Sequence, residues 1–239
     1  MFIISNFNQY LSNRLTIKME FVHPFTCIIA GASGSGKTVW VSRFLKNINR
    51  ICDVNFERVL LYYTEWQDTY RRDFRIESGP TVEFREGSPD PSHYSHDNER
   101  KKLVILDDLM RESSNEVIMD LFSRGSHHKN LSVLYITQNI FHQGKGQRDI
   151  SLNAKYIVLF KSPRDRSQIR HLAQQIYPED VKFVQEVFKH ATILPHSYLF
   201  LDLSQKTPDE LRFRSCIFPD DSKNYAYIPK KSNVSSIDL

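Results

Sequence analysis

The feature that most constrains this chain is the stretch FTCIIAGASGSGKTVW at residues 25–40, where a short apolar run ends in a glycine-rich turn. Only 8 of the 239 residues are glycine, yet Gly31, Gly34 and Gly36 all fall here. Residues 31–38 match the pattern GxxxxGK[ST] at every fixed position, after a predicted strand and before a predicted helix. The stretch therefore predicts a strand, a phosphate-binding loop and a helix in succession.

Such a loop is typical of chains that bind ATP. Glycines let the backbone bend so that several N–H groups point at phosphate oxygens, and the following helix adds its positive N-terminal end. Lys37 can reach the β- and γ-phosphates, and the Thr38 hydroxyl can bind Mg²⁺. A glycine turn without a ligand is the alternative. The predicted nucleotide-binding residues are Gly31, Ala32, Ser33, Gly34, Ser35, Gly36, Lys37 and Thr38.

Apolar stretches alternate with amphipathic ones along the chain. The predicted strands are residues 25–30, 58–64, 81–87, 103–108, 131–139, 155–160, 197–203 and 211–218. The predicted helices are residues 37–49, 115–124, 166–176 and 178–190. This order indicates an α/β fold with a mainly parallel central sheet flanked by helices, followed by C-terminal strands. Ligands of such folds bind at the carboxyl ends of the strands.

The composition is that of a globular protein, with 40% hydrophobic and 25% charged residues. A net charge of +4 permits contact with nucleic acid without requiring it. No run approaches 18 apolar residues and no basic leader precedes a cleavage site, so neither a membrane span nor a signal peptide is expected. Three scattered cysteines favour reduced, intracellular conditions, with Cys27 as a core residue.

Two acids end the strongly apolar stretch LVILDD at residues 103–108. A phosphate loop of this type needs a second strand that delivers a carboxylate to Mg²⁺, and Asp107 is suited to that role. Asp108 follows directly and could orient or deprotonate an attacking water. An acidic turn after a core strand is the alternative.

Gln138 lies near the end of another apolar stretch, LSVLYITQN at residues 131–139. A glutamine at the end of a strand beside the phosphate-loop strand could hydrogen-bond the γ-phosphate or the water. A polar cap on a core strand would give the same pattern.

Arg124, between the acid stretch and the glutamine stretch, is a candidate for an arginine that stabilises transition-state charge in a neighbouring subunit. Competing candidates for this role are Arg164, Arg166 and Arg170, and each of the four could instead be a surface charge. His127 and His128 lack a third ligand at suitable spacing and are predicted to be loop residues.

In this order, the glycine loop, LVILDDLM at 103–110 and HHKNLSVLYITQNIF at 127–141 resemble the genome-packaging ATPases of the FtsK–HerA superfamily. Within it, the chain is most similar to the branch carried by poxvirus-like large DNA viruses, virophages and Maverick-type elements. The stretches at 151–178 and 197–219 also resemble that branch. The resemblance extends over about residues 24–219.

The resemblance implies a RecA/FtsK-like P-loop NTPase fold with an additional strand between the phosphate-loop and acid strands. It also implies a homo-oligomeric ring, a pentamer or hexamer, that threads double-stranded DNA into a preformed capsid. By this resemblance, Lys37 and Thr38 bind nucleotide and Mg²⁺, and Asp107 is the acid on the side of the metal ion. Gln138 is then the sensor residue, which contacts the γ-phosphate or the attacking water.

Two positions depart from the family pattern. Asp108 stands where many relatives have a catalytic glutamate, which is one methylene longer. Arg124 lies in the region where family members carry the trans-acting arginine, but the loop separating it from Gln138 has a length that cannot be matched to the family.

The expected function is thus an ATP-driven motor that packages double-stranded viral DNA, with ATP and Mg²⁺ as cofactors and capsid proteins as partners. Residues 64–75 and 141–148 are candidate DNA-contacting loops, or else ordinary polar loops. The expected place of action is the host-cell site of virus assembly, in nucleus or cytoplasm, or the virion. The expected domains are an N-terminal extension (1–23), an ATPase domain (24–219) and a C-terminal tail (220–239).

Three alternatives remain on the sequence alone. A P-loop nucleotide or small-molecule kinase would need an arginine-rich lid, which KSPRDRSQIR at 161–170 could imitate. Another DNA-translocating or helicase-type P-loop ATPase would share the same motifs. A P-loop switch protein would bind nucleotide with little turnover, and the paired acids with Gln138 argue against that.

Overall fold

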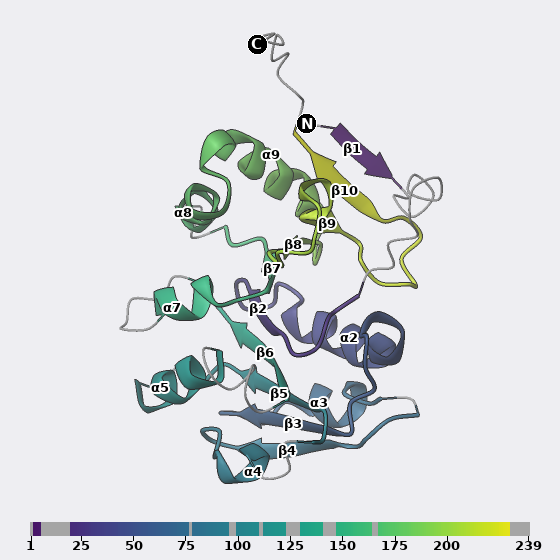
Figure 1. Cartoon of the computed structure of the whole chain (residues 1–239), viewed down its shortest axis with the longest axis vertical. Helices are drawn as coiled ribbons and strands as arrows, with labels where there is room; N and C mark the ends of the chain where they lie inside the picture. The colour runs from purple at the N-terminus through teal and green to yellow at the C-terminus, as the bar shows by residue number, and fades with distance from the viewer. Residues whose placement is uncertain are drawn as a thin grey trace, which may run out of the picture.

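The computed structural model describes residues 2–5, 20–76, 78–95, 99–109, 112–122, 130–140, 147–163 and 167–229. The strands are β1 (Phe2–Ser5), β2 (Thr26–Ala30), β3 (Arg58–Tyr63), β4 (Val82–Glu86), β5 (Lys102–Asp107), β6 (Leu131–Thr137), β7 (Tyr156–Phe160), β8 (Tyr198–Asp202), β9 (Phe213–Ser215) and β10 (Tyr225–Ile228). They form a 10-stranded sheet in the order β1-β10-β9-β8-β7-β2-β6-β5-β3-β4 (Figure 1).

The sheet has a parallel part and an antiparallel part. Strands β7, β2, β6, β5, β3 and β4 pair in parallel, while β8, β9, β10 and β1 extend the sheet in antiparallel pairs. The predicted fold class, a mainly parallel α/β sheet with C-terminal strands, is confirmed. Strand β6 lies between the phosphate-loop strand β2 and the acid strand β5, as the family resemblance implies.

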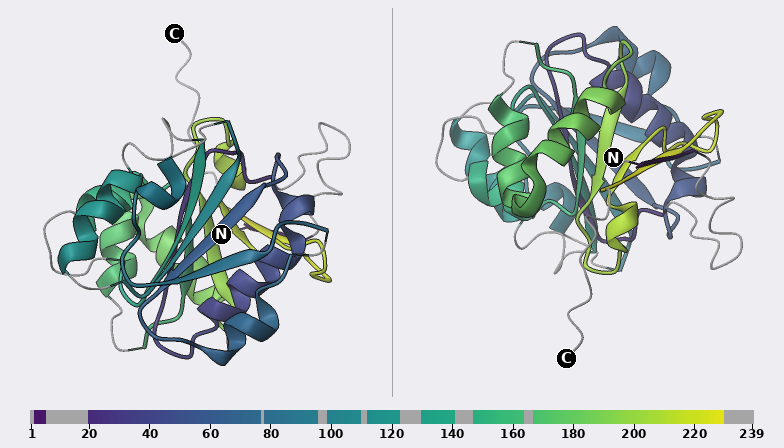
Figure 2. Two further views of the ribbon diagram at one scale, coloured as in Figure 1. Left: turned by 90° about the horizontal axis from the view of Figure 1, so that it is seen from below. Right: turned by 90° about the horizontal axis from the view of Figure 1, so that it is seen from above.

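The helices cover both faces of this sheet (Figure 2). They are α2 (Lys37–Ile51), α3 (Asp68–Asp73), α4 (Ser92–Ser95), α5 (Glu112–Asp120), α7 (Gln147–Leu152), α8 (Ser167–Ile176) and α9 (Val181–Ala191), with short 3-10 turns η3 (Pro178–Asp180) and η4 (Asp209–Leu211). None of the helices in the described ranges is long and apolar enough to cross a membrane.

Strand side chains alternate between two apolar cores. Cys27 and Ile29 of β2 pack in the core beneath α2 and α3. Ile28 and Ala30 pack in the opposite core, beneath α5, α7, α8 and α9. Because successive residues of a strand point to opposite faces, a strand covered on both sides reads as one continuous apolar run. This is why the sequence predicted the central strands well.

The edge strands were harder to predict. Strands β1 and β10 lie in residues assigned above to the N-terminal extension and the C-terminal tail, and they pair with each other. Each has only four residues, FIIS and YAYI, which is too short for a clear apolar pattern. The predicted strand at 211–218 is reduced to β9, because the chain turns at Cys216, whose φ is 55°. The domain limits themselves stay a prediction.

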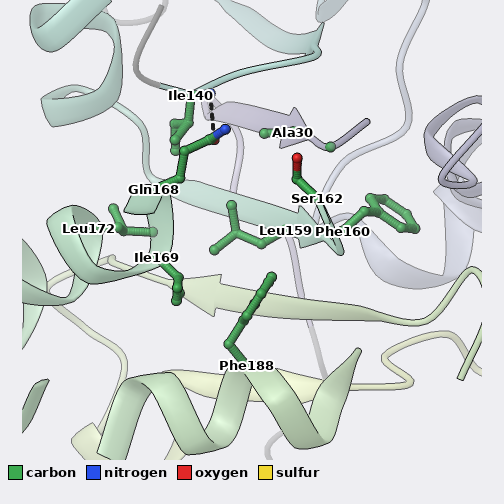
Figure 3. A pocket seen from close by; sticks show the side chains of 10 residues that line it. Ala30, Ile140, Leu159, Phe160, Ser162, Gln168, Ile169, Leu172 and Phe188 are labelled. Carbon is green, nitrogen blue, oxygen red and sulfur yellow. Dashed lines mark hydrogen bonds between the residues drawn. The ribbon is translucent and has the colours of Figure 1, made fainter. Parts of the chain in front are cut away.

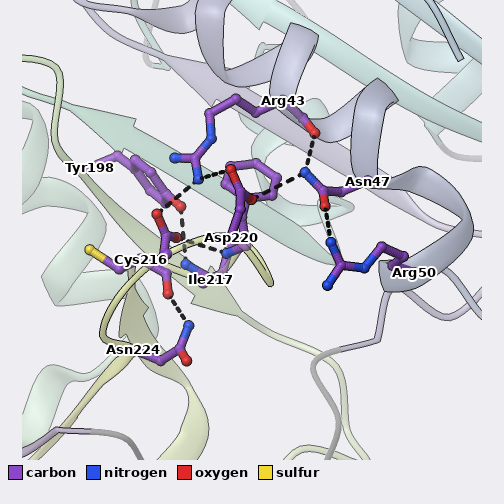
Figure 4. A network of polar contacts seen from close by, with 10 residues as sticks. Arg43, Asn47, Arg50, Tyr198, Cys216, Ile217, Asp220 and Asn224 are labelled. Carbon is purple, nitrogen blue, oxygen red and sulfur yellow. Dashed lines mark hydrogen bonds and ion pairs between the residues drawn. The ribbon is translucent and has the colours of Figure 1, made fainter. Parts of the chain in front are cut away.

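Helix α2, which begins in the phosphate loop, is fastened to the turn that follows β9 (Figure 4). The Arg43 guanidinium donates to Asp220 and to Asp221, both at 2.9 Å, and lies 4.5 Å from the ring centre of Phe218. Asn47, one turn further along α2, donates to Asp220 at 3.2 Å. The helix that carries the phosphate loop is thus tied to the antiparallel part of the sheet.

Replacing Arg43 with alanine should destabilise the protein. Hydrogen bonds to charged groups contribute about 1.5 to 3 kcal/mol each, and Arg43 is partly exposed, so we expect a loss of about 2 kcal/mol in the free energy of unfolding. For a chain of this length, that corresponds to a fall of roughly 4 to 8 °C in Tm. Arg50→Ala is the matched control, since Arg50 donates to Asn47 at 3.2 Å. The control should change the free energy by less than about 0.5 kcal/mol, and equal effects would contradict the role of Arg43.

Candidate functional site

The glycine loop between β2 and α2 has the backbone conformation that only glycine adopts readily. Gly34 and Gly36 have φ values of 73° and 108°, in the left-handed region. Gly31 is required for another reason, since a Cβ there would lie 2.5 Å from Cβ of Phe160 on β7. The sequence pattern is therefore explained by local geometry at each of the three glycines.

Lys37 bends back over its own loop. Its Nζ donates to the carbonyl oxygens of Gly31 at 2.7 Å and Ala32 at 3.0 Å. Burial lowers the pKa of Lys37, while the nearby carboxylates of Asp107 and Asp108 oppose that shift. The ammonium group is thus held at the loop by acceptors that phosphate oxygens could replace.

The loop also contains a polar atom in need of a partner. In the described part of the chain, the Ser35 hydroxyl oxygen is buried and has no hydrogen-bond partner. A buried hydroxyl without a partner costs roughly 1 to 3 kcal/mol, and a phosphate oxygen would remove that cost. The geometry of Gly31–Thr38 therefore fits a bound phosphate chain.

Asp107 and Asp108 occupy different environments. Asp107 ends β5 and its side chain is buried, and Tyr70 of α3 donates a hydrogen bond from its hydroxyl to Oδ2. Burial raises the pKa of Asp107, and the hydrogen bond from Tyr70 lowers it. The negative charge of Asp108 also raises this pKa, and the positive charge of Lys37 lowers it. Asp108 has left the strand, with a φ of 52°, and its N–H donates to the carbonyl of Ile136 at 3.2 Å.

Gln138 and Asp108, predicted from separate stretches, meet in space. The Gln138 amide Nε2 donates to Asp108 Oδ2 at 3.2 Å. Within the described residues, Asp108 Oδ1 is buried and lacks a hydrogen-bond partner. The pairing of β5 with β6 explains the contact, because Asp107 lies opposite Ile136 and both chains then leave the sheet at the same edge.

Thr38 lies half-buried in the first turn of α2, as the magnesium prediction requires. Thr38 and Asp107 would supply one hydroxyl and one carboxylate oxygen. Mg²⁺ prefers such oxygen ligands and usually completes its shell with water and phosphate. The described ranges contain no cluster of three His, Cys, Asp or Glu side chains that could hold a metal ion on their own. The assigned roles of all these residues remain predictions.

An open pocket of about 330 Å³ adjoins the glycine loop, and it was not predicted from the sequence. Two large apolar side chains at its wall, Ile193 and Leu194, are 67% and 68% exposed. His196 has a φ of 60° and packs against Gly36, so the turn after α9 closes one side. The lining residues are Ala32, Ser33, Gly34, Ser35, Lys161, Pro163, Ile193, Leu194, Pro195, His196 and Ser197.

A much smaller cavity, of about 20 Å³, lies between β7 and the helices α8 and α9 (Figure 3). Its walls include Leu159, Leu172 and Phe188. It has room for about one water and cannot hold a nucleotide. Gln168 of α8 lines it and accepts a hydrogen bond from the N–H of Ile140 at 3.3 Å, which ties α8 to the chain just after Gln138.

Several predicted residues fall outside the part of the chain that the structure describes. These are Arg124, Arg164, Arg166, His127 and His128, together with residues 141–146 of the second candidate DNA loop. Arg170 is described and is exposed on α8. Tyr70 is the main residue that the sequence analysis missed, because nothing in the stretch DTYRRD connects it to an acid 37 positions away.

Comparisons with known proteins bear on the fold only. No protein-family model and no curated protein matches the sequence. Among solved structures, the chain is similar to the genome packaging NTPase B204 from Sulfolobus turreted icosahedral virus 2 in complex with ATP-gammaS, with 14% identity and a TM-score of 0.49, over 77% of this chain and 94% of that chain. It is also similar to the ATPase DotB of Legionella pneumophila, with 12% identity and a TM-score of 0.33, over 57% and 40%. Both TM-scores are below 0.5, so the chemistry of the site rests on the geometry of this chain.

The buried charge of Asp107 should cost stability when no metal is bound. Since its folded-state pKa is raised, the free energy of unfolding contains a penalty that is absent below the unfolded pKa of about 3.9, grows as pH rises toward the folded-state pKa and is fully present above it. Asp107→Asn should therefore raise the Tm of the metal-free and nucleotide-free protein at pH 7. Thermal unfolding at pH 7 and at pH values down to about 3.9 would test this, because the gain should disappear as pH falls to the unfolded pKa. A variant that is less stable at pH 7 would contradict it.

Proposed function

We propose that this chain is an ATPase that moves double-stranded DNA and packages viral DNA into a preformed capsid. Hydrolysis is supported most directly by the 3.2 Å contact between Gln138 and Asp108, at the sheet edge that also carries the glycine loop. Hydrolysis requires a base and a group that orients the water near the γ-phosphate. The order β2-β6-β5 brings candidates for both groups to one edge.

The roles of the side chains follow from their contacts. Lys37 exchanges the carbonyls of Gly31 and Ala32 for β- and γ-phosphate oxygens, and Ser35 gains an acceptor for its hydroxyl. Mg²⁺, held by Thr38 and Asp107, would neutralise charge on the phosphates. Asp108 accepts a proton from the attacking water, and Gln138, which already contacts Asp108, helps to orient that water.

The DNA-moving part of the proposal rests on the family resemblance of the sequence. It implies a pentameric or hexameric ring around double-stranded DNA, capsid proteins as partners, and action at the host-cell assembly site or in the virion. DNA contacts would go to phosphates without sequence preference. On the described segment 64–75, Arg71 and Arg75 are exposed and available for such contacts. Arg124 is the candidate trans-acting arginine.

A DNA-moving ATPase should hydrolyse ATP faster in the presence of long double-stranded DNA and should assemble as a ring with ATP and DNA. Phosphate release measured with and without DNA, together with the mass of the assembly in solution, would test both points. A monomer that no DNA stimulates and that transfers phosphate to a small acceptor would instead establish the kinase alternative.

Asp108→Asn should separate binding from hydrolysis. The amide keeps the size of the carboxylate and an oxygen that accepts from Gln138, but it cannot take a proton from water. We expect nucleotide binding to be retained and turnover to fall roughly 100-fold or more. Turnover close to that of the unchanged protein would exclude Asp108 as the base.

The pocket beside the glycine loop is suited to the nucleoside part of ATP. It begins at Ala32–Ser35, where the phosphates are expected, and continues to the exposed apolar pair Ile193 and Leu194. A nucleobase placed there would cover apolar surface that is otherwise in contact with water, which stabilises the complex.

Leu194→Ser should weaken ATP binding without weakening the binding of inorganic tripolyphosphate, which has no base. Loss of one leucine contact of about 1 to 2 kcal/mol corresponds to roughly a 5- to 30-fold rise in Kd. Leu152→Ser is the matched control, since Leu152 is 59% exposed and does not line the pocket. Titration calorimetry with both ligands would measure the effect, and equal weakening for ATP and tripolyphosphate would contradict this placement.

A further inference from the structure

The segment from Thr64 to Tyr70 is attached to the two acids at both of its ends. The Thr64 hydroxyl donates to the backbone carbonyl of Asp108 at 3.1 Å. The Tyr70 hydroxyl donates to Oδ2 of Asp107. The segment follows β3, and β3 pairs with β5, so it leaves the sheet beside the acids. Two independent contacts therefore join it to the predicted catalytic edge.

Tyr70 is held in place by other aromatic rings. Its side chain is only 1% exposed. Its ring lies 5.2 Å from that of Phe74 and 5.8 Å from that of Tyr63, and stacks on Phe84 at 6.2 Å with an interplanar angle of 21°. Trp66 packs on it edge-on at 5.7 Å. Because the ring is enclosed by these contacts, its hydroxyl group is fixed relative to Asp107.

A fixed donor on a buried carboxylate has a clear chemical consequence. A carboxylate has about four lone-pair positions on two oxygens, so a hydrogen bond to Oδ2 leaves lone pairs on the second oxygen available to a metal ion. Carboxylates that serve metal ions are commonly fixed by hydrogen bonds of this kind, and loss of such a partner weakens metal binding about 10- to 100-fold.

We propose that Tyr70 is a positioning residue that holds the Asp107 carboxylate in the orientation that Mg²⁺ requires in the nucleotide complex. The inference rests on the proposed function of the site, since it concerns the metal that accompanies ATP. Tyr70 acts through Asp107, to which its hydroxyl donates a hydrogen bond. The segment 64–70 thereby connects the surface around Trp66, which is 46% exposed, with the metal side of the site.

Tyr70→Phe tests the proposal, because it keeps the ring and removes only the hydroxyl. The matched control is Tyr62→Phe. Tyr62 is also 1% exposed, and its hydroxyl is 3.0 Å from Nδ1 of His93, but its ring packs in the core on the opposite face of the sheet. Both variants lose one buried hydroxyl contact, so their losses of stability should be similar, at about 1 to 3 kcal/mol.

The main measurement is the affinity of Mn²⁺, as a paramagnetic substitute for Mg²⁺, for the protein loaded with a non-hydrolysable ATP analogue. Electron paramagnetic resonance reports the free ion directly and does not depend on turnover. We expect Tyr70→Phe to weaken Mn²⁺ binding about 10- to 100-fold. Analogue binding without metal should be unchanged, and raised Mg²⁺ should restore hydrolysis. Tyr62→Phe should match the unchanged protein in all three measurements.

The outcomes separate this inference from the proposed function. If the unchanged protein fails to bind ATP with Mn²⁺, the proposed function is wrong. If it does bind them, and Tyr70→Phe has the same Mn²⁺ affinity as Tyr62→Phe, then Tyr70 has only a structural role and the inference is overturned.

If Tyr70→Phe does not fold, 3-fluorotyrosine at position 70 retains the hydroxyl. Its ¹⁹F resonance should then move when Mg²⁺ is added to the analogue-loaded protein. A resonance that does not move would overturn the inference.

Discussion

The position of β6 between β2 and β5 is the constraint on which the site depends. Parallel pairing on both sides of β6 aligns Ala30, Thr137 and Asp107 near the same edge of the sheet. The three strands then continue into the glycine loop, into Gln138 and into Asp108. With another strand order, the glycine loop, Gln138 and the two acids would not lie side by side at one edge of the sheet. The arrangement of these side chains is thus a consequence of strand order more than of any single side chain.

At this edge of the sheet, the described residues leave polar groups that a bound ligand could satisfy. Lys37 satisfies its ammonium group with backbone carbonyls, while Ser35 Oγ and Asp108 Oδ1 are buried and without hydrogen-bond partners in the described part of the protein. Asp108 also holds a left-handed backbone conformation that non-glycine residues seldom adopt. Unsatisfied groups and strained conformations of this kind concentrate at functional sites, where a ligand or transition state relieves them.

Much of this arrangement could be predicted from the sequence, and the limits have physical causes. The glycine loop and the strand around Leu103–Asp107 were predictable because each is encoded within a few adjacent residues. The contact between Asp108 and Gln138 was not predicted, although the rule that parallel strands end at one edge accounts for it once the strand order is known. Tyr70 could not be found in this way, because its contact with Asp107 depends on how a short helix packs. The pocket at Ile193 and Leu194 likewise depends on a turn that approaches the loop only in the folded chain.

The attachment of α2 by Arg43 has a mechanical consequence. Any displacement of the glycine loop would also displace the start of α2, because the helix begins at Lys37 within that loop. Since Arg43 and Asn47 join that helix to Asp220 and Asp221, the displacement reaches the turn next to β9 and, through it, the antiparallel extension of the sheet. Strands β8, β9, β10 and β1 are thereby joined mechanically to the helix that begins at the glycine loop.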